Sequence, residues 1–492
     1  MKPLRPVLVA AVMLALSACA TPPAKLHRPV LRDDVPLAGI PTSPHAGWPD
    51  AQWWKAYADP QLDRLIVLAM QQAPDLAVAR ARLASAEQNV RNAAAQAGLT
   101  VGGNAQFQRQ RISDHGLFPA KFLGFNWYNQ ADLGVQLDYD FDFWGAKKSA
   151  VEAALDQAHA AAAERSAAAI ALQNAVAATY FGWQADQARL RLADTAVQTQ
   201  QHVARLDALR VRQGVDQPDE LAQDQAQLAA LRQSQTTLAS SAKIRLAALA
   251  ALLGIAPAAL PALEIRPLPE PAQGLPSQAH LDLIARRPDI AASRWQVESA
   301  LRQTDVARAA FFPDVSISAL AGLSSIDMGK LLTGGSRVFD VGPAIHLPIF
   351  SGGRLQAAYG ISRAQLDSAV AQYNQTVINA ANQVASQTLS AEQLAARRRE
   401  QDGQLAADRS LLAKARARFA QGTTDARPNL DATLQLLQQQ DAAVSLHAQA
   451  LDTELNLIQA LGGGYRADRG PDAAPAPTSS PFTPGAADHE RD

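Results

Sequence analysis

The sequence has a single cysteine, Cys19, and few aromatic residues, which make up 5% of the chain. One cysteine allows no internal disulfide, and the nine histidines lie too far apart to suggest a zinc site. The formal net charge of −1 shows no bias toward nucleic acid or another polyanion. No phosphate-binding loop, dinucleotide fingerprint, nucleophile elbow or HExxH motif is present. We therefore expect no catalysis, no cofactor, no metal and no nucleic-acid partner.

A short apolar run over residues 7–16 follows two basic residues near the N-terminus. The run is too short to cross a bilayer as a mature helix, so it indicates a secretory signal peptide over residues 1–18. Its end, Leu-Ser-Ala-Cys, resembles a bacterial lipobox, in which the cysteine becomes the lipidated first residue. An ordinary signal peptide with an incidental cysteine is the alternative. The position of the only cysteine favours lipidation of Cys19, and Ala20 in place of an aspartate favours sorting to the outer membrane.

Composition divides the rest of the chain into four segments. Proline and polar residues without a period indicate an extended tether over residues 19–49. Two structural repeats are expected to follow, over residues 50–256 and 257–465. Residues 466–492 are rich in Pro, Ala, Ser and Asp, and we expect them to be disordered, with no assigned role.

The clearest strand pattern covers residues 133–143, where every odd position is apolar. Such alternation predicts a strand with one apolar and one wet face, the wet face carrying Asp138, Asp140 and Asp142. These aspartates are expected to face the lumen if the odd face meets lipid, although any water-facing strand needs polar residues. A run of roughly seventy residues without proline follows, which as a helix would be about 100 Å long.

The chain carries an internal repeat. Gly214, after a glutamine, recurs as Gly422, and Gly254, after a leucine, recurs as Gly462. Each copy therefore reads as helix, strand, strand, very long helix, turn and second helix. The expected elements are strands over about 101–143 and helices over about 146–212 and 218–254 in the first copy, and strands over about 314–350 and helices over about 353–420 and 428–461 in the second.

Two details of the second copy refine this interpretation. Pro343 and Pro348 each remove a ladder donor, so they are expected to mark the exit of the last strand into its helix. The last helix shows heptad spacing over residues 430–458, and only Asp441 interrupts its apolar seam. A soluble four-helix bundle would explain the heptads equally well, but it would not explain the strands.

Four strands of this length match membrane-spanning β-strands but are too few to close a barrel. Open edges cannot face lipid, and about eight strands is the smallest bacterial barrel. The chain is therefore expected to lend its strands to an oligomer, three copies giving twelve strands or four giving sixteen. Hairpins packed on the helices of a soluble α+β protein are the competing interpretation.

Several motifs between about residues 47 and 465 carry a family resemblance. They are Ile284-Ala285-Arg286-Arg287-Pro288-Asp289-Ile290, Phe312-Pro313, Pro348-Ile349-Phe350-Ser351-Gly352-Gly353-Arg354 and Asp142-Phe143-Trp144-Gly145. Together they resemble the outer-membrane factor (TolC-like) family. Gly47-Trp48-Pro49, Gln52-Trp53-Trp54, Arg294-Trp295 and Leu461-Gly462-Gly463-Gly464-Tyr465 are similar to its lipidated multidrug-resistance branch.

The resemblance implies an α+β membrane protein in which a homotrimer forms a twelve-stranded β-barrel, continued by a long periplasmic α-helical coiled-coil barrel. It implies a passive exit duct for drugs or other small toxic solutes, set in outer-membrane lipid and energised by an inner-membrane efflux pump through a periplasmic adaptor. An exit duct for a type I secreted polypeptide and a non-conducting scaffold lipoprotein remain alternatives.

The two helical turns are the expected contacts with the adaptor, through Gly214, Val215, Gly422 and Thr423. Plain turn chemistry is the alternative, since glycine fits a helix C-cap.

The resemblance also places four acids at the periplasmic aperture: Asp431, Glu220, Asp425 and Asp216. Three copies of a carboxylate around a narrow pore would repel anions and bind cations. Asp431 as a solvated helix residue is the alternative. Pro428, Phe419 and Thr424 depart from the family's pattern, so the resting pore is expected to be held differently here.

Overall fold

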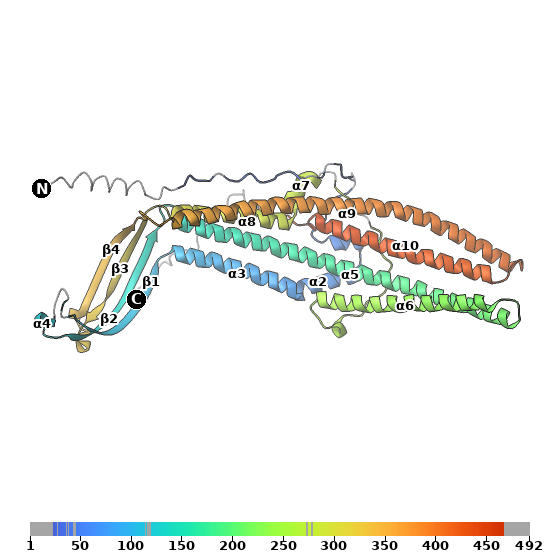
Figure 1. The fold of residues 1–492 in the computed structure, drawn as a ribbon, viewed down its shortest axis with the longest axis horizontal. Helices are drawn as coiled ribbons and strands as arrows, with labels where there is room; N and C mark the ends of the chain where they lie inside the picture. Colours follow the sequence, from blue (N-terminus) through green and yellow to red (C-terminus); the bar gives the residue numbers. More distant parts are fainter. Residues whose placement is uncertain are drawn as a thin grey trace, which may run out of the picture.

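The computed structural model describes residues 23–466, except residues 27, 36, 38, 43–45, 114, 116–119, 272–273 and 277–278. The described chain is elongated, with a β-sheet at one end and two helical hairpins at the other (Figure 1). Cys19, the expected signal peptide and all but the first residue of the expected disordered tail lie outside the described residues. No described helix combines the length and the apolar character needed to cross a membrane.

One antiparallel sheet holds all four expected strands, in the order β1 (Thr100–Arg111), β2 (Trp127–Phe141), β3 (Asp314–Ser325) and β4 (Arg337–His346). Leu133 lies opposite Ala105 on β1 and Leu323 on β3, so these three side chains share a face. This face is apolar and open to its surroundings, as shown by Leu133, which is 44% exposed. The alternation predicted from the sequence is therefore confirmed.

The strand ends differ from the prediction. β2 ends at Phe141 because the Asp142 carboxylate accepts the backbone N–H groups of Lys147 and Lys148 at 3.0 and 2.8 Å. Asp142 thus caps the first turn of the following helix and is not a strand residue. The expectation that Pro343 marks the exit of the last strand is wrong, since Pro343 lies within β4 opposite Ile317. A proline is tolerated there because β4 is an edge strand within the chain.

The two very long helices are α5 (Ala146–Arg212) and α9 (Arg354–Ala420), each 67 residues long. Each turns into a shorter antiparallel partner at the end remote from the sheet. The remaining helices are α2 (Pro60–Gln72), α3 (Pro74–Ala97), α4 (Ala120–Leu123), α6 (Pro218–Leu252), α7 (Ala279–Arg286), α8 (Pro288–Ala309) and α10 (Arg427–Ala460).

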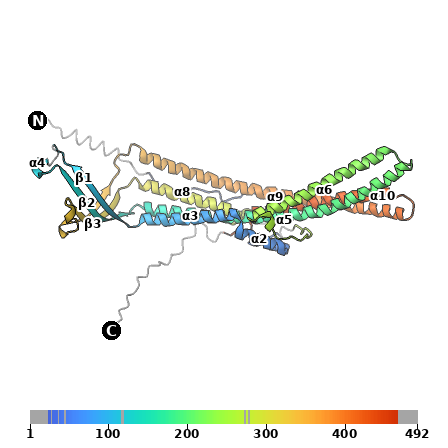
Figure 2. The same ribbon diagram turned by 90° about the horizontal axis from the view of Figure 1, so that it is seen from below.

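The helices lie side by side (Figures 1 and 2). Helices α3 and α6 pack against α5, helices α8 and α10 pack between α5 and α9, and α9 ends the row. The row thus ends at α9 on one side and at α3 and α6 on the other, just as the sheet ends at β1 and β4. One chain therefore has the form of a wall segment with two open edges.

The core lies where the two halves of the helical row meet. One apolar cluster gathers around Tyr180 and the other around Tyr373, both fully buried. Arg287, also buried, links three helices near the second cluster. Its guanidinium donates to the carbonyl of Ala460 at 2.8 Å, to Gln383 at 2.9 Å and to Asp289. The Arg-Pro-Asp motif therefore fixes the start of α8 against the end of α10.

The N-terminal segment expected to be a tether packs onto the helices. Val35 and Leu37 are buried in the second core cluster. The Tyr373 hydroxyl donates to the carbonyl of Arg32 at 3.0 Å, and Arg308 Nε donates to the carbonyl of Pro23 at 2.8 Å. Arg308 belongs to the last turn of α8, which leads directly into the sheet. The described start of the chain therefore lies near the end of the sheet that joins the helices.

Candidate functional site

The two hairpin turns have the same backbone geometry. The N–H of Gly214 donates to the carbonyl of Val211, and that of Val215 reaches back to Arg210. The second turn repeats the pattern, with Gly422 and Thr423 as donors. These are Schellman motifs, which require a left-handed residue, and Gly214 and Gly422 have φ of 70° and 69°. The sequence pattern thus correctly predicted two equivalent turns.

Arg210 joins these two turns. Its Nη2 donates to Asp216 of its own turn at 3.0 Å, and its Nη1 donates to Asp425 of the other turn at 2.6 Å. Two of the predicted acids therefore converge on one guanidinium. Arg210 and Asp425 are 215 residues apart in the sequence, so this link holds one hairpin tip against the other.

A second arginine, Arg427 at the start of α10, lies among three acids. It hydrogen bonds Asp207 of α5, donates to Asp224 of α6 at 3.0 and 3.1 Å, and contacts Asp431 of its own helix at 3.2 Å. Asp207 and Asp224 are buried, whereas Asp431 is half-exposed. We call Arg427, Asp207, Asp224 and Asp431 the arginine clamp, because together they connect both hairpins.

Burial raises the pKa of Asp224 to about 6, and the hydrogen bond with Asp207 acts in the same direction. The positive charge of Arg427 opposes this rise. The two carboxyl groups therefore hold a proton more readily together than a solvated pair would. Gln200 completes the surroundings by donating to Asp224 Oδ1 at 3.1 Å.

The structure thus gathers three of the four predicted aperture acids around two arginines. Asp216 and Asp425 bind Arg210, and Asp431 binds Arg427. Glu220, the fourth, is exposed in the first turn of α6. Sequence reasoning missed Arg210, Arg427, Asp207 and Asp224. The available signal was the two aspartates that interrupt otherwise Ala- and Leu-rich helices.

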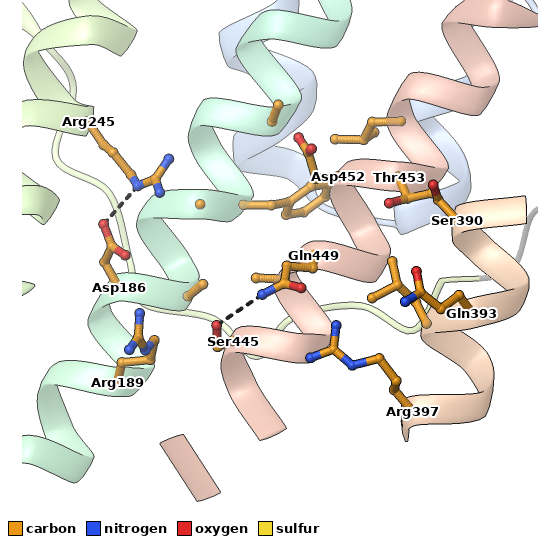
Figure 3. Close-up of a pocket in the computed structure, with 17 residues that line it drawn as sticks. Asp186, Arg189, Arg245, Ser390, Gln393, Arg397, Ser445, Gln449, Asp452 and Thr453 are labelled. Atoms are coloured by element: carbon orange, nitrogen blue, oxygen red, sulfur yellow. Dashed lines mark hydrogen bonds and ion pairs between the residues drawn. The ribbon is translucent and has the colours of Figure 1, made fainter. Parts of the chain in front are cut away.

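A cavity of about 570 Å³ opens between α5, α6, α9 and α10. In Figure 3 its labelled polar side chains come from all four helices. Arg245 Nε donates to Asp186 at 2.8 Å, and Gln449 donates to Ser445 at 3.4 Å. Phe181 contributes to an apolar part of the wall. These two contacts join residues of the lining to one another, and neither sets a nucleophile beside a general base.

Comparisons with known proteins agree on one family. The family model described as outer membrane efflux protein matches residues 65–255 and 281–463. The multidrug resistance outer membrane protein MdtP of Escherichia coli K12 is 32% identical over 446 residues, covering 89% of this chain and 90% of that protein. The protein MdtQ of Escherichia coli O157:H7 is 32% identical over 467 residues, covering 92% and 97%.

A solved structure gives the same result for the fold. The outer membrane protein VceC of Vibrio cholerae superposes with a TM-score of 0.77 at 32% identity, covering 85% of this chain and all of that one. Its fold, that of the TolC-like outer membrane channels, is the fold expected from the sequence. The two-part match covers well over half of the chain. The chain therefore belongs to the outer membrane efflux protein family.

Proposed function

We propose that three copies of this chain form the outer-membrane exit duct of a tripartite efflux system. The observation that carries the proposal is the sheet, which exposes an apolar face and ends in two open edges, β1 and β4. Lipid tolerates neither unpaired edge, so the strands must close with those of other copies. Three chains give twelve strands, and the open edges of the helical row meet in the same way.

The cargo in this proposal is drugs and other small toxic solutes, because the relatives MdtP and MdtQ are named multidrug resistance proteins. Conduction is passive and the chain is not an enzyme. An inner-membrane pump supplies the energy through a periplasmic adaptor. The adaptor binds the two hairpin turns, which lie at the end of the helices remote from the sheet (Figure 1). Val215, in the first of these turns, is 63% exposed.

The polar face of the sheet lines the duct. The even-numbered residues of β2, β3 and β4 lie opposite one another in the sheet and so share the polar face. All five aspartates of the strands have even numbers and therefore lie on this face. They are Asp132, Asp138, Asp140, Asp314 and Asp340. Asp140 pairs with Lys147 at 3.2 Å, and the other four carboxylates in a water-filled barrel favour cations, so the duct is expected to be cation-selective.

Lipidation of Cys19 fits the course of the N-terminal segment. Arg308, at the end of α8, holds the carbonyl of Pro23. Four residues span at most about 14 Å, so a lipid on Cys19 would lie close to the inner edge of the sheet. That is the height of the periplasmic leaflet, where an acyl chain can insert.

Gene deletion followed by complementation tests the proposed cargo. Deletion should lower the minimum inhibitory concentration of several unrelated drugs, and the wild-type gene should restore it. Unchanged drug sensitivity with the loss of a secreted polypeptide would instead indicate a type I secretion duct. Purified trimers that never conduct in planar bilayers, with either the wild-type chain or an Asp431→Ala variant, would indicate a scaffold. A Cys19→Ser variant should lose its acyl mass.

A further inference from the structure

We propose that the outer rim of the sheet binds the phosphate groups of a phosphorylated glycolipid in the outer leaflet, through Arg109, Arg111 and Arg337. The inference rests on the proposed function, which places the strand loops outside the cell and the helices in the periplasm. These three are the only arginines or lysines within the four strands. All three are exposed and lie at the loop end of the sheet.

The three arginines share the face that meets lipid. Arg109 pairs with Asn129 and Arg111 with Trp127, both in the odd-numbered row of β2 that continues into Leu133. Arg337 pairs with Leu323, which itself faces Leu133. The strand aspartates all lie on the opposite face, so the sheet separates its charges by sign. A need for solubility alone would not place every strand arginine on the apolar face.

The height of Arg109 and Arg111 matches a headgroup layer, whereas Arg337 is level with Leu133, two steps inside the outer end of the apolar row, and reaches the boundary by extending its side chain outward. The apolar row of β2 from Ala131 to Phe141 has ten steps of about 3.3 Å, which at a tilt of about 40° spans roughly 25 Å. That is the height of the apolar band of an outer-membrane barrel. Asn129, opposite Arg109, lies two steps farther out, or about 5 Å beyond the band. A phosphate at the lipid boundary lies within reach of such a side chain.

The side chains around the arginines suit an anionic headgroup. Arg109 lies over the Trp127 ring, with its guanidinium carbon 5.5 Å from the ring centroid. Trp127 is 54% exposed, as expected of an aromatic residue at a membrane interface. The stacked guanidinium keeps its edge donors available, and their fork geometry matches two phosphate oxygens. A ring of three chains would present nine arginines near the outer leaflet.

The test uses the purified trimer and counts bound lipid by native mass spectrometry. Wild-type protein is titrated with lipid A carrying two phosphates, with monophosphoryl lipid A and with phosphatidylcholine. The variant Arg109→Gln/Arg337→Gln is compared with Lys148→Gln/Arg354→Gln, which removes the same charge at the periplasmic end of the sheet. The charge-retaining variant Arg109→Lys/Arg337→Lys is measured alongside.

The proposal expects the outer-rim glutamine variant to bind at least threefold less bis-phosphorylated lipid A, with single-channel conductance unchanged. The periplasmic-end variant should bind as the wild type does, and binding should weaken as phosphates are removed. The lysine variant should bind less than the wild type but more than the glutamine variant, because an ammonium keeps the charge without the fork of the guanidinium. Equal binding by the two glutamine variants, or binding of the wild type that ignores lipid phosphate, would overturn it. If the glutamine variant does not assemble, the phosphate series on the wild-type trimer still decides the matter. Wild-type trimers that do not conduct would instead contradict the proposed function as an exit duct.

Discussion

The guanidinium of Arg427 donates to both carboxylate oxygens of Asp224, at 3.0 and 3.1 Å. The two residues are 203 positions apart and belong to different hairpins. Bidentate pairs of this kind fix orientation as well as distance. The contact therefore makes the start of α10 and the start of α6 move together, and it resists any separation of the hairpins that would widen the duct.

Removing the arginine clamp should favour the open duct. In Arg427→Gln the hairpins lose the ion pairs of the clamp, and Asp207 and Asp224 are left facing each other, while the Arg210–Asp425 pair at the turns remains. Because the Arg427 side chain is 35% exposed, we assign the lost contact about 1 kcal/mol, which shifts the ratio of closed to open duct about fivefold. Single-channel recordings should show a corresponding rise in open probability.

Arg212 provides the control for this variant. It lies near the tip of α5, and its Nε hydrogen bonds only the carbonyl of Ala208 in its own helix. Arg212→Gln should therefore gate like the wild type. An equal rise in open probability in both variants would show that general loss of positive charge, and not the clamp, controls gating.

The clamp should tighten as the pH falls through about 6. The pKa of Asp224 is about 6 in the clamp, whereas the ordinary value of an aspartate is 3.8. Between these two pH values the clamped form therefore binds more protons than the open form. Acid therefore stabilises the clamped form, and this contribution is lost as the pH rises through about 6. The pKa of Asp207 is lowered in the clamp, so its protonation destabilises the clamped form, but only at pH values below its ordinary pKa of 3.8.

Open probability should accordingly be lower at pH 5 than at pH 7.5, and Asp224→Asn should abolish the difference. Asp219→Asn changes a neighbouring acid in the first turn of α6 and should keep it. A wild-type duct that opens more readily at pH 5 would contradict the sign of this argument.

The ion pair between Arg189 and Asp441, which interrupts the apolar seam of α10, should be replaceable by two apolar residues. Arg189 donates to Asp441 at 2.8 and 2.9 Å, which explains why an aspartate occupies a heptad core position. Both side chains are about one-third exposed, so a coupling of at most about 1 kcal/mol is expected in a double-mutant cycle. Arg189→Met/Asp441→Leu should therefore unfold at a higher denaturant concentration than Asp441→Leu alone. Additive losses would argue against the pair.

Adjacent residues of β2 should respond in opposite ways to a new charge. Val135 lies on the apolar face and Gln136 on the polar face. An arginine in the lipid at mid-height costs about 2–4 kcal/mol, so Val135→Arg should reduce the amount of folded protein in the outer-membrane fraction. Gln136→Arg should assemble normally and lower cation selectivity. The reverse pattern would mean that the faces have been assigned the wrong way round.

The features predictable from sequence were those set by local periodicity. The alternation in β2 and the absence of proline in α5 each depend on one stretch of chain. Asp142 was wrongly predicted to be a strand residue because the alternation continues past it, although its carboxylate caps the next helix. The burial of Val35 in the second core cluster could not be predicted, because it lies in a proline-rich segment without periodicity. The partnership of Arg427 with Asp224 depends on the meeting of two distant hairpins, which no periodicity records.

The central claim is that each chain contributes an incomplete wall and that three chains together enclose the duct. Native mass spectrometry of the detergent-extracted protein tests it most directly. We predict a single species of three times the mature chain mass, in which every chain carries an acyl modification. A monomer that leaves the membrane fraction without detergent would contradict the account.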